Sequence, residues 1–110
     1  MPPPDVRRFP WGEVVTLDEG CGYRVKRVTV EPGHRLEYRV HATRTEHWVV
    51  VRGTALVTLD RIPFTLKAGG TIAIPPGGAH RVENIGSGPM VFVEVQTGEP
   101  IGEDAIVSLD

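Results

Sequence analysis

Glycine and proline interrupt this chain so often that no long helix fits between them. Its 110 residues include 13 Gly and 10 Pro, and no stretch of a dozen residues keeps a helical period without one of them. The intervals are short and rich in β-branched residues, which favour strands. We therefore predict an all-β chain whose strands close into a barrel or sandwich, with at most one helical turn in the tail GEDAIVSLD. The eight predicted strands are YRVKRVTV, RLEYRV, EHWVVV, TALVTL, PFTL, TIAIP, HRVEN and MVFVEVQ.

Chain length predicts one compact domain with a single core. We place an N-terminal arm over residues 1–10, which is Pro-rich and a candidate for disorder, and the barrel over residues 11–110. Phe9 and Trp11 are suited to tie the arm to the barrel. Cys21 is the only cysteine, so the sequence excludes an internal disulfide and a Cys-based zinc site, and we expect a small, at least half-buried thiol.

Charge and hydropathy narrow the function classes. The net charge is −2, with 40% hydrophobic and 24% charged residues, which argues against nucleic acid or an anionic membrane as a main partner. No apolar stretch is long enough to cross a bilayer. The first residues lack the apolar segment of a secretory signal, so we expect a cytoplasmic protein.

The segment from Leu36 to His41 alternates strictly between apolar and polar residues. Its even positions are apolar, and the odd ones, Glu37, Arg39 and His41, are polar. A strand here would turn one face to the core and the other either to water or to a polar pocket inside a small barrel. The strand alone does not decide between these two environments.

Two blocks of the sequence have chemistry-bearing residues at fixed spacings. The first contains Gly33, Arg39, His41, Glu46 and Gly53. The second contains Gly69, Pro75, Gly77, His80 and Asn84. These spacings resemble the two motifs of the cupin superfamily: the second is matched at every position, and the first departs only at Arg39, where the family has His or Gln. The resemblance implies a double-stranded β-helix, or jelly-roll barrel, with turn glycines at Gly53, Gly69 and Gly77.

The chain is also similar to the type II phosphomannose isomerase family from about Arg8 to Asp110. The segments that carry this similarity are RFPWG, YRVKRVTVEPG, EHWVVVRGTALVTL, IPPGGAHRVEN and FVEVQTGEPIGEDAIVSLD. The resemblance implies isomerisation of mannose 6-phosphate to fructose 6-phosphate in a pocket inside the barrel. In that family the cupin stands alone or follows a guanylyltransferase domain, and we expect this chain to inherit only the isomerase activity.

The resemblance assigns metal binding to His41, Glu46 and His80. Two imidazoles and a carboxylate suit a divalent transition metal and leave positions open for substrate oxygens. Residues so distant in sequence can converge inside a closed barrel. We expect Zn, Mn, Ni, Co or Fe as the ion and a sugar phosphate as the ligand.

Arg39 is the main departure from the family pattern. A guanidinium about 4 Å from a divalent ion would be repelled by roughly 8 kcal/mol at an effective dielectric of about 20. Arg39 therefore has to turn outward, pair with Glu37, or pair with Glu46; in the last case the arginine would replace the ion. Arg44 matches a family arginine and is a candidate phosphate ligand, with a solvated loop charge as the alternative. Arg39 is a second candidate for substrate binding.

Several functional alternatives remain open at this point. Glu37 is a candidate general base, as is His41 if it binds no metal, and Arg44 is a further catalytic candidate. The main alternative to a metal-dependent isomerase is a non-catalytic, metal-free cupin that binds a sugar or sugar phosphate. Another metal-dependent reaction, such as oxygenation, is a third. We also expect a homodimer, because exposed strand edges favour association.

Overall fold

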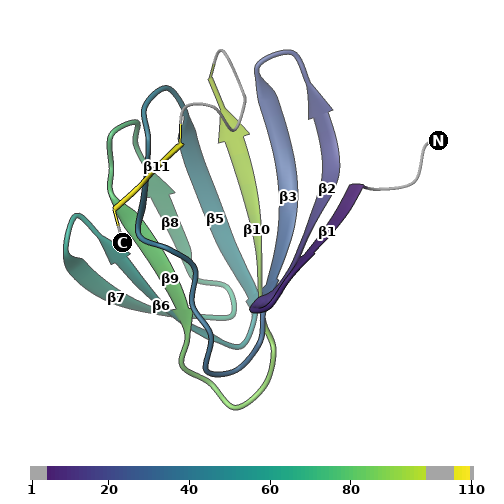
Figure 1. Ribbon diagram of the computed structural model, residues 1–110, viewed down its shortest axis with the longest axis vertical. Helices are drawn as coiled ribbons and strands as arrows, with labels where there is room; N and C mark the ends of the chain where they lie inside the picture. The colour runs from purple at the N-terminus through teal and green to yellow at the C-terminus, as the bar shows by residue number, and fades with distance from the viewer. Residues whose placement is uncertain (1–4, 99–105, 110) are drawn as a thin grey trace.

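A computed structural model describes residues 5–98 and 106–109, which form eleven strands and no helix. The strands make two antiparallel sheets that face each other (Figure 1). The first sheet contains, in spatial order, β1 (Asp5–Phe9), β2 (Gly12–Gly20), β3 (Tyr23–Val30), β10 (Met90–Thr97), β5 (Thr45–Arg52) and β8 (Thr71–Ile74). The second contains β11 (Ile106–Ser108), β4 (Arg39–His41), β9 (His80–Asn84), β6 (Thr54–Leu59) and β7 (Ile62–Lys67). The all-β, single-domain prediction is confirmed.

The interior between the sheets is apolar at one end and polar at the other. On β10 the inward residues run from Met90 and Phe92 to Glu94 and Gln96, all buried. Strand pairing aligns Phe92 with Val28 of β3 and Val50 of β5, while Gln96 aligns with Arg24 and Glu46. The same strands therefore build the core near one end of the barrel and a polar chamber near the other. The core cluster comprises Val28, Val30, Trp48, Val50, Ala55, Val57, Ile74, Val82, Met90 and Phe92.

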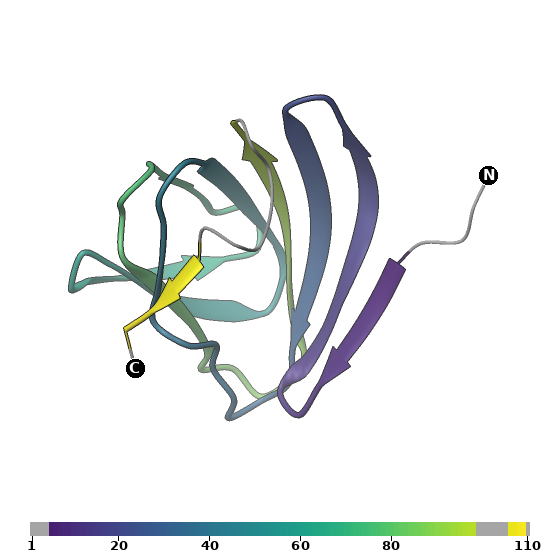
Figure 2. The same ribbon diagram turned by 45° about the horizontal axis from the view of Figure 1, so that its top comes forward.

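The eight predicted strands all correspond to observed strands, but three others were missed. Strands β1 and β2 form the outer edge of the larger sheet (Figure 2). Every residue of β1 is exposed, so burial leaves no alternation for a sequence pattern to reveal. The described part of the predicted arm is β1, and Phe9 stacks on Trp11 with ring centroids 4.8 Å apart.

The tail, for which at most one helical turn was expected, is a strand over Ile106–Ser108, while residues 102–105 and 110 lie outside the described part. The segment is strand β11, paired antiparallel with β4 in the register Ile106 to His41 and Ser108 to Arg39. The free edge of β4 provides hydrogen-bonding groups that a helical turn would leave unpaired.

The alternating segment before His41 turns its polar side inward. Glu37, Arg39 and His41 all line the central pocket. Tyr38 lies on the other side, where its hydroxyl accepts a hydrogen bond from the backbone N–H of Arg61 at 2.8 Å. The prediction of an apolar face toward the core therefore fails at Tyr38 and holds for Leu36, which packs against the core. The polar side therefore lies along the pocket, with His41 buried in it and the side chain of Glu37 still 55% exposed.

Turn chemistry follows the sequence closely. Gly53, Gly69 and Gly77 have φ of 84°, 90° and 81°, a region that non-glycine residues avoid, so the predicted turn glycines are confirmed. Cys21 is exposed, against our prediction, because it lies in the tight turn between β2 and β3. Within the described residues we find no helix with the length and hydropathy to span a membrane.

Candidate metal centre in the barrel pocket

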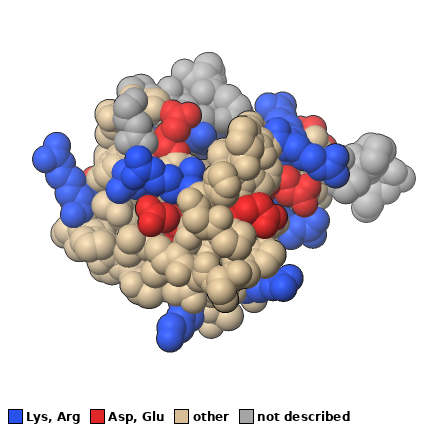
Figure 3. Space-filling model, turned by 60° about the horizontal axis from the view of Figure 1, so that its bottom comes forward, with Lys and Arg blue, Asp and Glu red and all other residues tan. Residues whose placement is uncertain are grey.

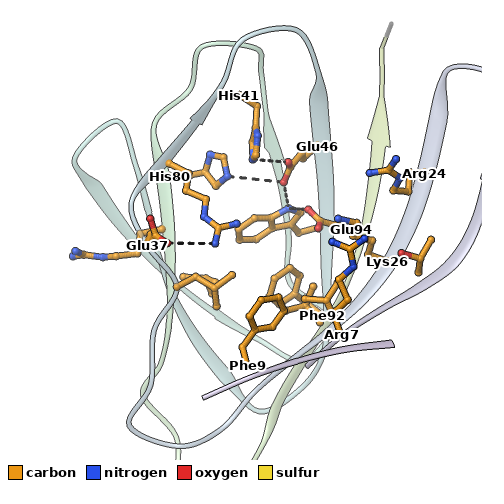
Figure 4. A pocket seen from close by; sticks show the side chains of 18 of the residues that line it. Arg7, Phe9, Arg24, Lys26, Glu37, His41, Glu46, His80, Phe92 and Glu94 are labelled. Atoms are coloured by element: carbon orange, nitrogen blue, oxygen red, sulfur yellow. Dashed lines mark hydrogen bonds and ion pairs between the residues drawn. The ribbon is translucent and has the colours of Figure 1, made fainter. Parts of the chain in front are cut away.

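His41, Glu46 and His80 converge inside a pocket of about 610 Å³ at the polar end of the barrel. They come from the end of β4, the start of β5 and the start of β9, and all three are buried. One potential ligand atom from each lies within 4.8 Å of the others, and Figure 4 shows the three side chains pointing toward one another. The structure thus brings together the three residues that the sequence assigned to a metal site.

Local structure orients His80. The Pro75–Gly78 turn precedes it, and the N–H of Gly77 donates to the backbone oxygen of His41 at 2.9 Å. The Nδ1 atom of His80 lies 2.9 Å from the carbonyl of Gly78. That contact turns the opposite nitrogen, Nε2, toward Glu46, whose Oε1 is 4.0 Å away. The turn therefore fixes both the position and the rotation of this ring.

A second carboxylate lies beside Glu46. The indole Nε1 of Trp48 donates to Glu46 Oε1 at 2.9 Å and to Glu94 Oε2 at 3.1 Å. Gln96 Nε2 donates to Glu94 Oε1 at 3.3 Å. Neither Trp48 nor Glu94 is among the site residues that the sequence predicted. The alternation of β10 could have identified Glu94, because it lies two residues after Phe92 and therefore on the same inward side of the strand.

Arg39 and Arg44 do not lie where the sequence suggested relative to the predicted metal ligands. Arg39 lies nearest Glu37, with Nη2 to Oε1 at 3.9 Å and 30% of its side chain exposed, so pairing with Glu37 is the observed alternative. Arg44, expected at a phosphate or in solvent, is only 5% exposed. Its Nε donates to Glu46 Oε2 at 2.9 Å, and its Nη2 lies 3.1 Å from His41 Nε2. The arginine among the predicted metal ligands is therefore Arg44.

Burial and neighbouring charges set the protonation of the site. Burial lowers the pKa of His41 to about 4, against the opposing attraction of Glu46. Burial alone would raise the pKa of Glu46, but a hydrogen bond with Glu94 and the charges of His41, Arg44 and His80 outweigh it and lower the pKa to about 2. Burial, reinforced by the Glu46 carboxylate, raises the pKa of Glu94 well above its ordinary value. Near neutral pH, His41 is thus an unprotonated imidazole beside an ionised Glu46.

These protonation states suit a divalent ion, since His41 and Glu46 both offer lone pairs. His41 Nε2 lies 3.0 Å from Glu46 Oε2 and 3.1 Å from Arg44 Nη2. One ring nitrogen can either donate to the carboxylate or accept from the guanidinium, so one contact is always unsatisfied. A cation between the nitrogen and the carboxylate would accept both lone pairs. The donor set therefore fits a metal, provided that Arg44 moves.

Basic side chains also line the pocket on the side of β1 and β3. Figure 4 shows Arg7, Arg24 and Lys26 on the opposite side of the pocket from Glu37. All three have acidic neighbours: Arg24 Nε lies 3.0 Å from Glu19 Oε2, Arg7 Nε lies 3.5 Å from Asp5 Oδ2, and the charge of Lys26 acts on Glu94. The face in Figure 3 likewise shows basic and acidic side chains interspersed. Basic and acidic side chains are therefore mixed in this pocket wall as they are on that face, and the wall includes Arg24 and Lys26 as possible contacts for an anionic ligand.

Known proteins show the same domain. A curated relative, the mannose-1-phosphate guanylyltransferase of Escherichia coli strain K12, is 45% identical over 98 residues, which are 89% of this chain and 20% of that protein. The chain spans about a fifth of the length of the curated relatives that it matches first. These relatives are enzymes of sugar-phosphate metabolism.

Solved structures agree on the fold. The cupin domain of Schizosaccharomyces pombe Cnp3 matches with a TM-score of 0.77 at 15% identity, covering 86% of this chain and 69% of that one. A Bacillus subtilis oxalate decarboxylase described by its Mn(II) centres matches with a TM-score of 0.80 at 29% identity, covering 96% of this chain and 30% of that one. The predicted cupin fold is confirmed. The family model for the mannose-6-phosphate isomerase C-terminal domain matches residues 5–110, and the chain belongs to that family.

Proposed function

We propose that this chain isomerises a phosphorylated sugar, mannose 6-phosphate to fructose 6-phosphate, with a divalent metal held by His41, Glu46 and His80. The observation that carries the proposal is the convergence of these three side chains within 4.8 Å inside a pocket. Membership of the mannose-6-phosphate isomerase C-terminal family supports the substrate class. A phosphorylated mannose is also named in the relatives' activity, and we carry that chemistry, rather than guanylyl transfer, to this chain.

The metal proposal rests on the donor set. Two imidazoles and one carboxylate suit Zn, Mn, Ni, Co or Fe, and the Mn(II) centres of oxalate decarboxylase support a metal in this type of barrel. Such an ion would polarise the sugar carbonyl and stabilise the negative charge that develops on its oxygen. The turn at Gly78 and the indole of Trp48 hold His80 and Glu46 in orientation.

We assign the phosphate to the basic wall formed by Arg24 and Lys26. Both lie on β3 and line the pocket. Arg24 is partly buried, with 19% of its side chain exposed, which favours a stronger interaction with a phosphate than a fully solvated charge would give. Of the two arginines that the sequence suggested, Arg44 contacts Glu46, and Arg39, which also lines the pocket, stays a further candidate for the phosphate.

Proton transfer between the two sugar carbons needs a group that faces the ligand. Glu37 lines the pocket and stays a candidate base. Glu94 also lines the pocket, and its raised pKa means that it keeps a proton to higher pH than an ordinary carboxyl. We assign Glu94 the part of hydrogen-bond donor to Glu46, holding that carboxylate in its ionised form.

The direct test is a coupled assay that follows fructose 6-phosphate formation from mannose 6-phosphate. The parent is assayed after chelator treatment, then with Mn, Zn, Ni, Co or Fe added separately. We expect turnover that depends on one or more of these ions and is lost in His80→Ala. The exposed His47→Ala is the matched control, since His47 lies on the outer side of β5. Absence of turnover with every ion would remove the enzyme proposal.

A second candidate, a non-catalytic and metal-free sugar-phosphate-binding protein, is favoured by one observation. Arg44 already forms an ion pair with Glu46 at 2.9 Å, where a metal would bind. Calorimetric titration of mannose 6-phosphate in the presence of chelator distinguishes the two candidates. Binding with chelator, combined with no turnover under any ion, would favour the binding protein. The homodimer and the cytoplasmic location stay predictions, and gel filtration with light scattering tests the first.

A further inference from the structure

Arg44 occupies the centre of the proposed metal site. Its guanidinium contacts Glu46 Oε2 at 2.9 Å and His41 Nε2 at 3.1 Å. These are the two atoms whose lone pairs a divalent ion would need. The side chain of Arg44 is 6% exposed and that of Glu46 is 2% exposed, so solvent screens this interaction only weakly.

We propose that Arg44 is a resident cation of the site and that a divalent metal binds only by displacing its guanidinium. The inference rests on the proposed metal site and adds a control over its occupancy. Guanidinium and metal compete for the same carboxylate oxygen and the same imidazole nitrogen, and their positive charges repel each other at this distance. Metal affinity is therefore reduced by the free energy of moving Arg44 away.

The packing around Arg44 holds its backbone in place, so a displacement of the guanidinium has to come from its side chain. Arg44 lies in the short connection between β4 and β5, outside regular strand pairing. The backbone there packs tightly against Gly98: an added Cβ at Gly98 would lie 2.6 Å from the oxygen of Thr43 and 3.2 Å from Arg44 Cα. In the proposed displacement the element that moves is therefore the arginine side chain, which belongs to a residue outside the paired strands.

Arg39, unlike Arg44, does not lie between the proposed metal ligands. Its nearest acidic contact is Glu37, at 3.9 Å, and it is the weakest of the named influences on the pKa of His41. Neutralising Arg39 therefore removes a positive charge near the pocket without removing a contact to the metal-binding atoms. Arg39→Met is the control for both Arg44→Gln and Arg44→Met, because Gln at position 39 would introduce the residue that the cupin motif has there.

The experiment measures Mn²⁺ binding to chelator-treated protein by the electron paramagnetic resonance signal of the free ion, without substrate. We expect Arg44→Gln to bind Mn²⁺ at least about tenfold more tightly than the parent, because no guanidinium has to be displaced. Arg39→Met should stay within about threefold of the parent. Adding His80→Ala to Arg44→Gln should abolish the gain. Circular dichroism checks folding, and Arg44→Met is the second neutral variant if Arg44→Gln does not fold.

The outcomes separate the inference from the function on which it rests. Equal Mn²⁺ affinity in the parent and in the folded neutral variants, lost with His80→Ala, would overturn the competition while leaving the metal site intact. Equal gains in Arg39→Met and Arg44→Met would also overturn it, since a general charge effect would then suffice. If no variant binds Mn²⁺, Zn²⁺ or Co²⁺ above background, the metal site itself fails and the inference fails with it. Missing isomerase turnover alone bears on neither result.

Discussion

The two ends of the barrel interior are built by the same strands and obey different rules. At the apolar end, Phe92 is 1% exposed and stacks on Trp48 with ring centroids 4.5 Å apart. Glu94 and Gln96 follow Phe92 along β10 at intervals of two residues. They lie at the polar end and are also buried. A strand that keeps one face inward thus passes from core to site without changing its fold.

Polar groups at the two ends differ in how completely they are paired. At the apolar end, Asn84 donates to the backbone oxygens of Val30 and Gly88 at 2.8 and 2.9 Å, and it accepts from the N–H of Gly86 at 2.9 Å. At the polar end, His41 Nδ1 and Gln96 Oε1 are buried without a hydrogen-bond partner among the described residues. Unpaired buried polar atoms cost stability. We therefore infer that the apolar end stabilises the fold and that the unpaired groups of the polar end are available to a ligand.

The largest expected effect comes from emptying the apolar end. Phe92→Ala should lower the free energy of unfolding by about 3–5 kcal/mol, through lost burial and a residual cavity. It also removes the ring that supports Trp48, so Mn²⁺ affinity should fall as well. Urea unfolding measures the stability change. Phe64→Ala on exposed β7 is the control, with an expected loss under about 1 kcal/mol; similar losses at both positions would contradict the division of labour between the two ends.

The second-largest effect should come from removing the hydrogen bonds of Asn84 at the apolar end while keeping its side-chain volume. Asn84→Leu is close in shape but leaves two carbonyl oxygens and one N–H without their side-chain partner. Each stranded group costs about 1–3 kcal/mol, and we expect a total on the order of 3 kcal/mol by urea unfolding. Metal affinity should change little, since Asn84 contacts neither His41 nor Glu46. A neutral result would show that water replaces the amide at this end.

The apolar end was also the easier one to predict. Short β-rich runs and the spacing of Gly53, Gly69 and Gly77 led to the barrel because turns and strands follow local rules. Edge strands such as β1 follow no burial pattern, and β11 forms only because β4 offers an unpaired edge. The sequence of one segment does not reveal which distant segment it will pair with.

At the polar end, residue identity was predictable and side-chain direction was not. Motif spacing selected His41, Glu46 and His80, which the structure brings together. Sequence reasoning placed the interfering charge at Arg39, because that position departs from the family pattern. The structure places it at Arg44, whose rotamer depends on contacts from β5 and β4 that become visible only after folding. Glu94 was missed because its importance arises from its contact with Glu46 across two strands.

A smaller effect, visible as a pH dependence, should come from Glu94→Gln. Burial and the Glu46 charge raise the pKa of Glu94 above its unfolded value of about 4.5. Between that value and the folded pKa, the folded state holds a proton that the unfolded state has released, so stability falls as pH rises through this window. Glutamine cannot titrate, and the variant should gain stability relative to the parent as pH increases.

Urea unfolding of the parent and Glu94→Gln at a series of pH values above 4.5 measures this difference. Glu31→Gln, at an exposed position, is the control and should parallel the parent. Glu46 is present in both proteins, and its lowered pKa gives stability that is lost as the pH falls below about 4.5. The free energy of unfolding should therefore fall at acidic pH in both proteins. Parallel curves for the parent and Glu94→Gln above pH 4.5 would show that Glu94 is ionised like an ordinary carboxyl.

The smallest effect should come from the polar end itself, and it completes the contrast with Asn84. Gln96→Met keeps the side-chain volume, removes an unpartnered oxygen, and gives up a single 3.3 Å hydrogen bond to Glu94. A lost hydrogen bond and a relieved unpaired atom nearly cancel, so we expect a change in unfolding free energy within about 1 kcal/mol. A loss as large as that of Asn84→Leu would mean that Gln96 Oε1 is paired in solution, through water that enters from the pocket. The polar end would then be as well satisfied as the apolar end, and unpaired groups would no longer distinguish the site from the core.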